Sequence, residues 1–181
     1  MSGAAEKRKF VFTGRWIPEK GDSGKVFTSF KYWVTPDFGI GVDYRPLVDD
    51  ISLTATYRLI PEDPTGFNPA IILGTSVDDF SDNDIDVNSR SIFVTASKAL
   101  PDMEFIGITP APYAGAVWIE ELDKLRFLAG VSLKHEQASL MVQYSGTDTH
   151  LTLSRVLNDN VSISAIYWGM KYPGLGIRFR F

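Results

Sequence analysis

Apolar and polar residues alternate along most of this chain, with a period of two that predicts β-strands. Helical periodicity is almost absent, and turn-forming residues separate the alternating stretches. We therefore predict an all-β, antiparallel, up-and-down barrel of about twelve strands, with ten or fourteen as alternatives. The predicted strands cover residues 9–17, 26–34, 39–45, 51–60, 68–77, 89–100, 103–109, 125–134, 139–145, 149–157, 160–169 and 174–181.

The predicted connections fall into two classes. Every second one is tight, at residues 158–160, 135–137, 101–102, 61–67 and 35–37, and the two longest, 77–88 and 110–124, belong to the other class. Membrane barrels place short turns on the periplasmic side and longer loops outside. This pattern predicts a transmembrane barrel with both termini in the periplasm. No composition break divides the chain, so we expect one domain over residues 1–181, with a flexible N-terminus at 1–8.

The two faces of the predicted strands differ in chemistry. In the strand 51–60, for example, Ile51, Leu53 and Tyr57 alternate with Ser52 and Thr54. A soluble barrel shows the same alternation with its apolar face inward, but its other face is dense in Lys and Glu. Here the polar face is rich in Gly, Ser and Thr, which suits a lumen. Aromatic residues on the apolar face near strand ends resemble the girdles of membrane barrels: Trp16, Tyr32, Tyr44, Tyr57, Tyr144 and Tyr167.

The last strand carries a more specific signal. Leu175, Ile177, Phe179 and Phe181 alternate with Gly176, Arg178 and Arg180, and a Phe is the final residue. This segment resembles the terminal signal of bacterial outer-membrane barrel proteins, which the barrel-assembly machinery recognises. The resemblance implies a location in the bacterial outer membrane, in contact with its lipids and lipopolysaccharide.

A second resemblance lies in the middle of the chain. The segments Asn-Pro-Ala-Ile-Ile-Leu-Gly-Thr-Ser at 68–76 and Ser-Ile-Phe-Val-Thr-Ala-Ser-Lys at 91–98, with an acidic loop between them, are similar to a hairpin of the YjbH/GfcD-like proteins. The segment 37–44 has a related pattern. Proteins of that family are longer outer-membrane proteins tied to exopolysaccharide or capsule production, so the resemblance implies a link to surface polysaccharide.

Composition narrows the function classes. The net charge of −4 argues against nucleic-acid binding, and the absence of cysteine excludes disulfides and thiol chemistry. No apolar run is long enough for a transmembrane helix. The first residues have charges without an apolar core, so they are not a signal peptide, and we expect the chain to be a mature form.

Charge on the predicted lumen face is mostly basic, with Asp43 as the clearest acid. A narrow lumen with low-dielectric walls concentrates such charge and favours anions. The alternative is that acidic loop residues fold inward and pair with these bases in a closed plug. The basic residues of the lumen face are Arg15, Lys31, Arg45, Arg58, Arg126, Lys134, Arg178 and Arg180.

Other candidate chemistry is weaker. Asp82, Asp84 and Asp86 could present oxygens to Ca²⁺, but the spacing does not fit an EF-hand, and we expect a solvated loop and no metal or other cofactor. His135 precedes Ser139 by four residues, and His150 precedes Ser154 by four. Residues four apart on a strand lie about 13 Å from one another, too far for a Ser–His hydrogen bond. We expect no enzyme.

The sequence therefore predicts a small channel or export-associated porin of the outer membrane, with a basic lumen that favours anionic solutes or polysaccharide. Two alternatives remain open. One is a closed structural or adhesive barrel that presents its loops to partners, and the other is a soluble, lipocalin-like ligand-binding barrel.

Overall fold

The structure, a computed structural model, describes residues 9–63, 66–76, 90–120 and 123–181. Within these residues it has twelve β-strands, one short helix and one 3₁₀ turn. In chain order they are β1 (Phe10–Trp16), α1 (Asp22–Lys25), β2 (Val26–Trp33), β3 (Phe38–Arg45), β4 (Asp50–Ile60), β5 (Ala70–Ser76), β6 (Ser91–Ser97), η2 (Pro101–Met103), β7 (Thr109–Ile119), β8 (Lys124–His135), β9 (Ala138–Tyr144), β10 (Thr149–Val156), β11 (Val161–Trp168) and β12 (Tyr172–Arg180).

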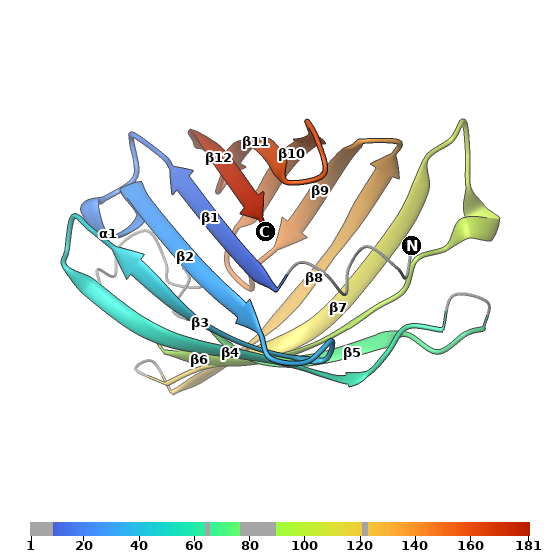
Figure 1. The fold of residues 1–181 in the computed structure, drawn as a ribbon, viewed down its shortest axis with the longest axis horizontal. Helices are drawn as coiled ribbons and strands as arrows, with labels where there is room; N and C mark the ends of the chain where they lie inside the picture. The colour runs from blue at the N-terminus through green and yellow to red at the C-terminus, as the bar shows by residue number, and fades with distance from the viewer. Residues whose placement is uncertain (1–8, 64–65, 77–89, 121–122) are drawn as a thin grey trace.

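The strands form a closed barrel in which each strand pairs antiparallel with its neighbours in the sequence, and β12 pairs with β1 to close the wall (Figure 1). This confirms the predicted fold class and the strand number. Closure leaves no unpaired sheet edge. The last residue takes part in it, because the backbones of Phe10 and Phe181 exchange two hydrogen bonds, of 2.9 and 3.0 Å.

Both described ends of the chain lie at one end of the barrel, which we call the terminal end. The opposite end, where the connections 17–25, 46–49, 120–123, 145–148 and 169–171 lie, is called the loop end. The short helix α1 belongs to the first of these connections. No helix within the described residues is long and apolar enough to cross a membrane.

The seventh strand differs from the prediction. Residues 103–109 were expected to form a strand and 110–124 a long loop, but η2 and an isolated bridge occupy 101–108, and β7 runs from Thr109 to Ile119. Pro110 and Pro112 are in this strand, paired with β8. Their carbonyls accept hydrogen bonds from the backbone N–H groups of Leu100 and Lys98, respectively, which lie beyond the end of β6. Because the regular pairing with β6 has already ended there, the missing N–H of each proline interrupts no ladder of hydrogen bonds.

This correction also removes part of the expected sorting of connections by length. The segment 110–124 is mostly strand, and several connections at the loop end are as short as those at the terminal end. The long connection 77–90 joins β5 to β6 at the loop end, and its residues 77–89 lie outside the described residues. Loop lengths therefore no longer support an orientation of the barrel.

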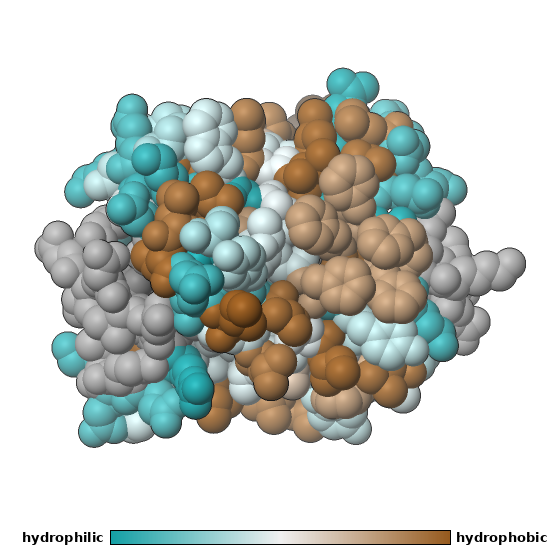
Figure 2. Space-filling view, turned by 60° about the vertical axis from the view of Figure 1, so that its left-hand side comes forward, coloured by the Kyte–Doolittle hydropathy of each residue, from teal (hydrophilic) through white to brown (hydrophobic). Residues whose placement is uncertain are grey.

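The apolar side chains of the strands point outward. Leu53 is 81% exposed, Leu125 69% and Ile51 67%, whereas the polar residues Asp43, Arg45 and Thr54 are buried inside. Figure 2 shows one side of this outer wall, where apolar side chains occupy much of the surface and hydrophilic residues gather toward its edges. Five of the six predicted girdle residues, Trp16, Tyr44, Tyr57, Tyr144 and Tyr167, are exposed on the outer wall, and Tyr32 is half-buried.

Aromatic rings also gather on the outer wall where the barrel closes. Phe10 of β1 lies 4.9 Å from Tyr32, 5.7 Å from Phe30 and 6.0 Å from Phe181, measured between ring centroids. Phe12 and Phe179 form a further pair at 6.3 Å across the β1–β12 seam. The outward face of the closing strand is therefore packed against its neighbours by aromatic contacts near the terminal end.

Candidate functional site

The barrel encloses a cavity of about 460 Å³ along the inner faces of β9 to β12 and β1. Alternation places every second residue of these strands inside, and several of those residues are small. The lining combines hydroxyl groups and arginines with apolar side chains such as Met141, Val156 and Ile166. Its hydroxyl and arginine residues include Thr13, Ser139, Thr152, Ser154, Ser162 and Ser164, together with Arg15, Arg178 and Arg180. Small polar side chains leave space in the lumen, and their hydroxyls can donate to or accept from a polar solute.

Cross-strand pairing brings the basic residues of this cavity together. Arg178 of β12 is paired with Ser162 on one side and Thr13 on the other, and Arg180 is paired with Val11. Lys31 is the next residue beyond Val11 in the same row across the wall. Its Nζ donates a 3.0 Å hydrogen bond to Thr56 Oγ1. Three cations from β2 and β12 thus lie within neighbouring rows of the terminal half of the lumen.

A cluster of large side chains lies inside the barrel near the loop end, and four of its members also line the cavity. The Arg15 guanidinium lies 4.9 Å from the Phe27 ring centroid and 4.6 Å from that of Trp168. Lys20 Nζ lies 4.2 Å from the Trp168 centroid, and the His150 ring lies 4.1 Å from it. We call these five residues the cation–aromatic layer. Its aromatic faces stabilise the two cations without neutralising them.

His150 is held in place within this layer. Its Nδ1 accepts a 2.9 Å hydrogen bond from the backbone N–H of Gly169, so the neutral ring carries its proton on Nε2. Ser154, four residues further along β10, instead shares a 2.9 Å hydrogen bond with Ser164. The other His–Ser combination lies on opposite faces, since His135 pairs with the outward Ala138 and Ser139 faces the cavity.

Apolar side chains fill the lumen beside the cation–aromatic layer. Val117 and Ile119 of β7 and Leu128 of β8 form a buried cluster, with Phe93 packed against it, and Ile17 is fully buried as well. The interior therefore has an apolar region on β7 and β8, while the cavity lies along β9 to β12 and β1.

The remaining predicted lumen bases lie outside the cavity lining. Arg45 is buried near the loop end, where its Nε lies 3.4 Å from Asp50 Oδ2. Arg58 forms a half-exposed ion pair with Asp37, with 3.5 Å between Nη1 and Oδ1. Arg126 is half-buried and donates to Thr147 Oγ1 at 3.4 Å, and Lys134 is exposed at the terminal end of β8. Arg15, Arg178 and Arg180 are thus the members of the predicted set that share the cavity.

Sequence reasoning missed the apolar half of the lumen. Val117 and Ile119 occur in the segment that was expected to be a loop, and Trp168 and Phe27 lie on the polar phase of predicted strands. The sequence does contain one sign of this strand. The run from Ala116 to Ile119 has no alternating polar residues, which is typical of a strand with two apolar faces.

Neither the models of known protein families nor the curated protein sequences contain a match to this chain. The positions Asp82, Asp84 and Asp86, considered above for Ca²⁺, lie outside the described residues, as do residues 1–8. Among the residues that are described, no group of three or more His, Asp or Glu side chains is placed to hold a metal ion.

Proposed function

We propose that this chain is a β-barrel of the bacterial outer membrane whose lumen takes up small anionic solutes. The observation that carries the proposal is the direction of the strand faces. Large aliphatic side chains such as Leu53 and Leu125 are exposed on the outside, while Asp43 and Arg45 are buried inside. Full burial of one such aliphatic side chain is worth about 1.5–3 kcal/mol, so a wall of them favours a lipid surrounding.

The soluble alternative predicts the opposite arrangement. A lipocalin-like barrel encloses an apolar cavity and presents polar side chains to water. In this chain the cavity lining includes serines, threonines and arginines beside apolar residues such as Met141 and Ile166, and the apolar phase of the strands faces outward. This contrast supports the membrane proposal over the soluble carrier.

The preference for anions follows from the charges in the cavity. Arg15, Arg178 and Arg180 line it, Lys31 lies beside them, and Asp43 is the buried acid on the same wall. A low-dielectric wall strengthens the field of these cations inside the lumen. Phosphate, sulfate or uronate groups are the anions that such a site would attract, and the YjbH/GfcD-like resemblance extends the proposal to acidic surface polysaccharide.

The terminal end would face the periplasm. An even strand number returns the chain to the side on which it entered, and Phe181 at the terminal end carries the resemblance to the signal that the assembly machinery recognises. The loop end would then face the exterior and the lipopolysaccharide.

The first test is the behaviour of the protein with and without lipid. We expect it to aggregate in detergent-free buffer, and to fold into phospholipid vesicles as a barrel that resists added protease. A monodisperse, folded protein in plain buffer would contradict the proposal.

The second test is conductance in a planar bilayer under a salt gradient. We expect a reversal potential that favours anions, and the double variant Arg178→Gln with Arg180→Gln should reduce that preference. Arg58→Gln is the matched control, because Arg58 is ion-paired outside the cavity lining. A preference for cations would contradict the basic lumen.

A second candidate function rests on the cation–aromatic layer. This layer and the buried Ile17, Val117 and Ile119 place large side chains inside the barrel near the loop end. If the barrel inserts into bilayers but conducts no ions, we propose the closed barrel that presents its loops to partners.

A further inference from the structure

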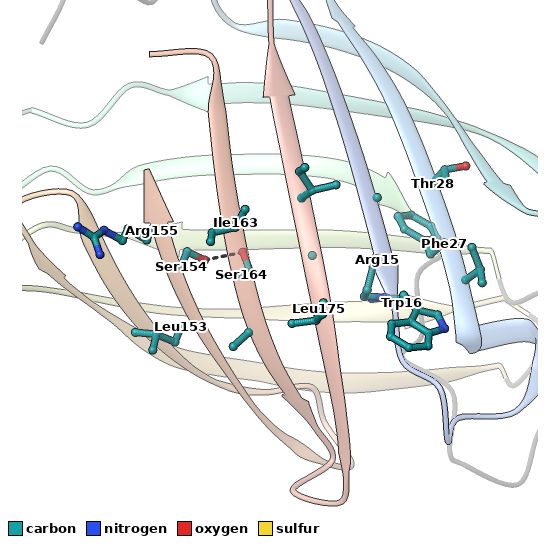
Figure 3. A pocket seen from close by; sticks show the side chains of 15 residues that line it. Arg15, Trp16, Phe27, Thr28, Leu153, Ser154, Arg155, Ile163, Ser164 and Leu175 are labelled. Carbon is teal, nitrogen blue, oxygen red and sulfur yellow. Dashed lines mark hydrogen bonds between the residues drawn. The ribbon is translucent and has the colours of Figure 1, made fainter. Parts of the chain in front are cut away.

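The outer wall of the barrel contains a groove of about 640 Å³ that the proposed channel does not use. The groove crosses five adjacent strands, β10, β11, β12, β1 and β2, which lie side by side in the wall (Figure 3). Its outward side chains form two neighbouring rows across these strands. They are Arg155, Ile163, Ile177, Gly14 and Thr28 in the first row, and Leu153, Ala165, Leu175, Trp16 and Val26 in the second.

Small residues make the wall hollow at this place. Gly14 and Ala165 lie between larger neighbours, among them Trp16, Leu175 and Ile177. The absence of a side chain at Gly14 is not forced by crowding, because a Cβ there would meet its nearest atom, on Ile177, at an ordinary 3.5 Å. The groove is therefore open space over the backbone of β1 that a chain of methylene groups could fill.

One charge lies in this otherwise apolar wall. Arg155 is exposed, pairs with Ala138 and Ile163, and shares its outward face with Leu153. Within the described strands, it is the only Lys, Arg, Asp or Glu in the outward phase. Its side chain makes no hydrogen bond or ion pair with the described residues. A lone cation on a lipid-facing wall is costly unless an anion meets it or it reaches the headgroups.

Arg155 lies at the height on the wall where lipid headgroups would surround it. It is the penultimate residue of β10, next to the turn at the terminal end. From Arg155 the two rows run obliquely across the wall toward the loop end. The row of paired residues that contains Arg155 at the terminal end of β10 reaches Thr28 in the loop-end half of β2. Four steps between strands span about 19 Å along the wall, and with strands tilted by about 35–45° this row descends by about 11–13 Å. That depth lies within one leaflet of about 15 Å.

We propose that this groove binds one acyl chain of a glycerophospholipid from the leaflet at the terminal end, and that Arg155 binds its phosphate. The proposal rests on the membrane location proposed above. The matching features are a charge complementary to phosphate at the leaflet surface, and an apolar trough that begins there and runs into the wall. Guanidinium groups bind phosphate oxygens with two parallel hydrogen bonds.

The test is native mass spectrometry of the protein refolded into phosphatidylglycerol nanodiscs and released in mild detergent. We expect the wild-type barrel to retain one phosphatidylglycerol. Arg155→Gln should lower the retained fraction about tenfold, because a charged hydrogen bond is lost, and Arg155→Lys should lower it less. Ala165→Leu, which fills the groove, should lower it as well. Ala114→Leu is the matched control, since Ala114 is an exposed outward residue of β7 on another part of the wall.

Protease resistance of each variant in the nanodisc is measured in parallel and separates this inference from the membrane proposal. Failure of the wild-type to insert would overturn both. Insertion with no retained lipid would overturn the groove proposal alone. So would retention by Arg155→Gln and Ala165→Leu that equals retention by the wild type. Release of the protein as an oligomer that Ala165→Leu dissociates would also overturn it, because the groove would then be covered by a second copy of the chain.

Discussion

Replacing Leu53 by Arg distinguishes a lipid-facing wall from a water-facing one. Leu53 lies on β4 opposite Val42, which is in the middle of β3, and its side chain is 81% exposed on the outer wall. If water surrounds the barrel, a charged residue at such an exposed position changes the free energy of unfolding by about 0.5 kcal/mol or less. If lipid surrounds it, an Arg near the middle of the bilayer costs about 2–4 kcal/mol.

The control is Phe67→Arg. Phe67 is fully exposed in the connection between β4 and β5, at the terminal end and outside the strands. Near the membrane surface, the cost of an Arg falls to about 0–1 kcal/mol. The two substitutions therefore differ by about 1–4 kcal/mol in a bilayer and hardly at all in water.

The assay is reversible unfolding by guanidinium chloride of the barrel in phosphatidylcholine vesicles, followed by tryptophan fluorescence. The midpoint of the Leu53→Arg variant should fall clearly below those of the wild type and Phe67→Arg, with an unchanged slope. A shift of the unfolding free energy below about 0.5 kcal/mol for Leu53→Arg would refute the reasoning, since the wall would not then be in hydrocarbon.

Three further predictions concern the interior and the seam. Arg45→Met should destabilise the barrel by about 3 kcal/mol because it removes the buried cation beside the largely buried Asp50 carboxylate. Arg58→Met, in a half-exposed ion pair, should cost less than about 1 kcal/mol in the same titration. Gly130→Ala should cost about 1–3 kcal/mol, because its Cβ would lie 2.4 Å from a backbone oxygen, while Gly14→Ala should be nearly neutral. Phe181→Ala should reduce the amount of folded barrel in outer-membrane fractions of expressing cells, with normal refolding in vitro; equal amounts would contradict an assembly role.

Most of the wall was predictable from the sequence because the signal is local. The alternation in 51–60 or 125–134 fixes which residues share a face without knowledge of any partner strand, and β4 and β8 occur where expected. The seventh strand was not predictable by this route. Its prolines argue against a strand. They are tolerated because β6 ends beside them, and where β6 ends cannot be read from the sequence of the seventh strand itself.

For the candidate site, the sequence predicts only which side chains point into the barrel. Alternation places Arg15, Arg45 and Arg178 on the inner face equally well, but the stagger of the strands decides what each one meets. Arg45 meets Asp50 near the loop end, Arg15 meets two aromatic rings, and Arg178 meets hydroxyls around open space. A sequence pattern with period two contains no information about this stagger.

The closing strand connects the proposed location with the proposed chemistry. Its outward residue Phe179, together with Phe181 just after its end, packs on the aromatic rings of β1, and its inward residues, Arg178 and Arg180, line the cavity. Because successive side chains of a strand point to opposite faces, each set can change without moving the other. The outward set is constrained by closure of the barrel and the inward set by the charge of the lumen. The nine-residue strand β12 therefore meets two requirements, closure of the barrel and the charge of the lumen, with different side chains. Because these side chains are separate, the lumen charge can be varied in an intact barrel.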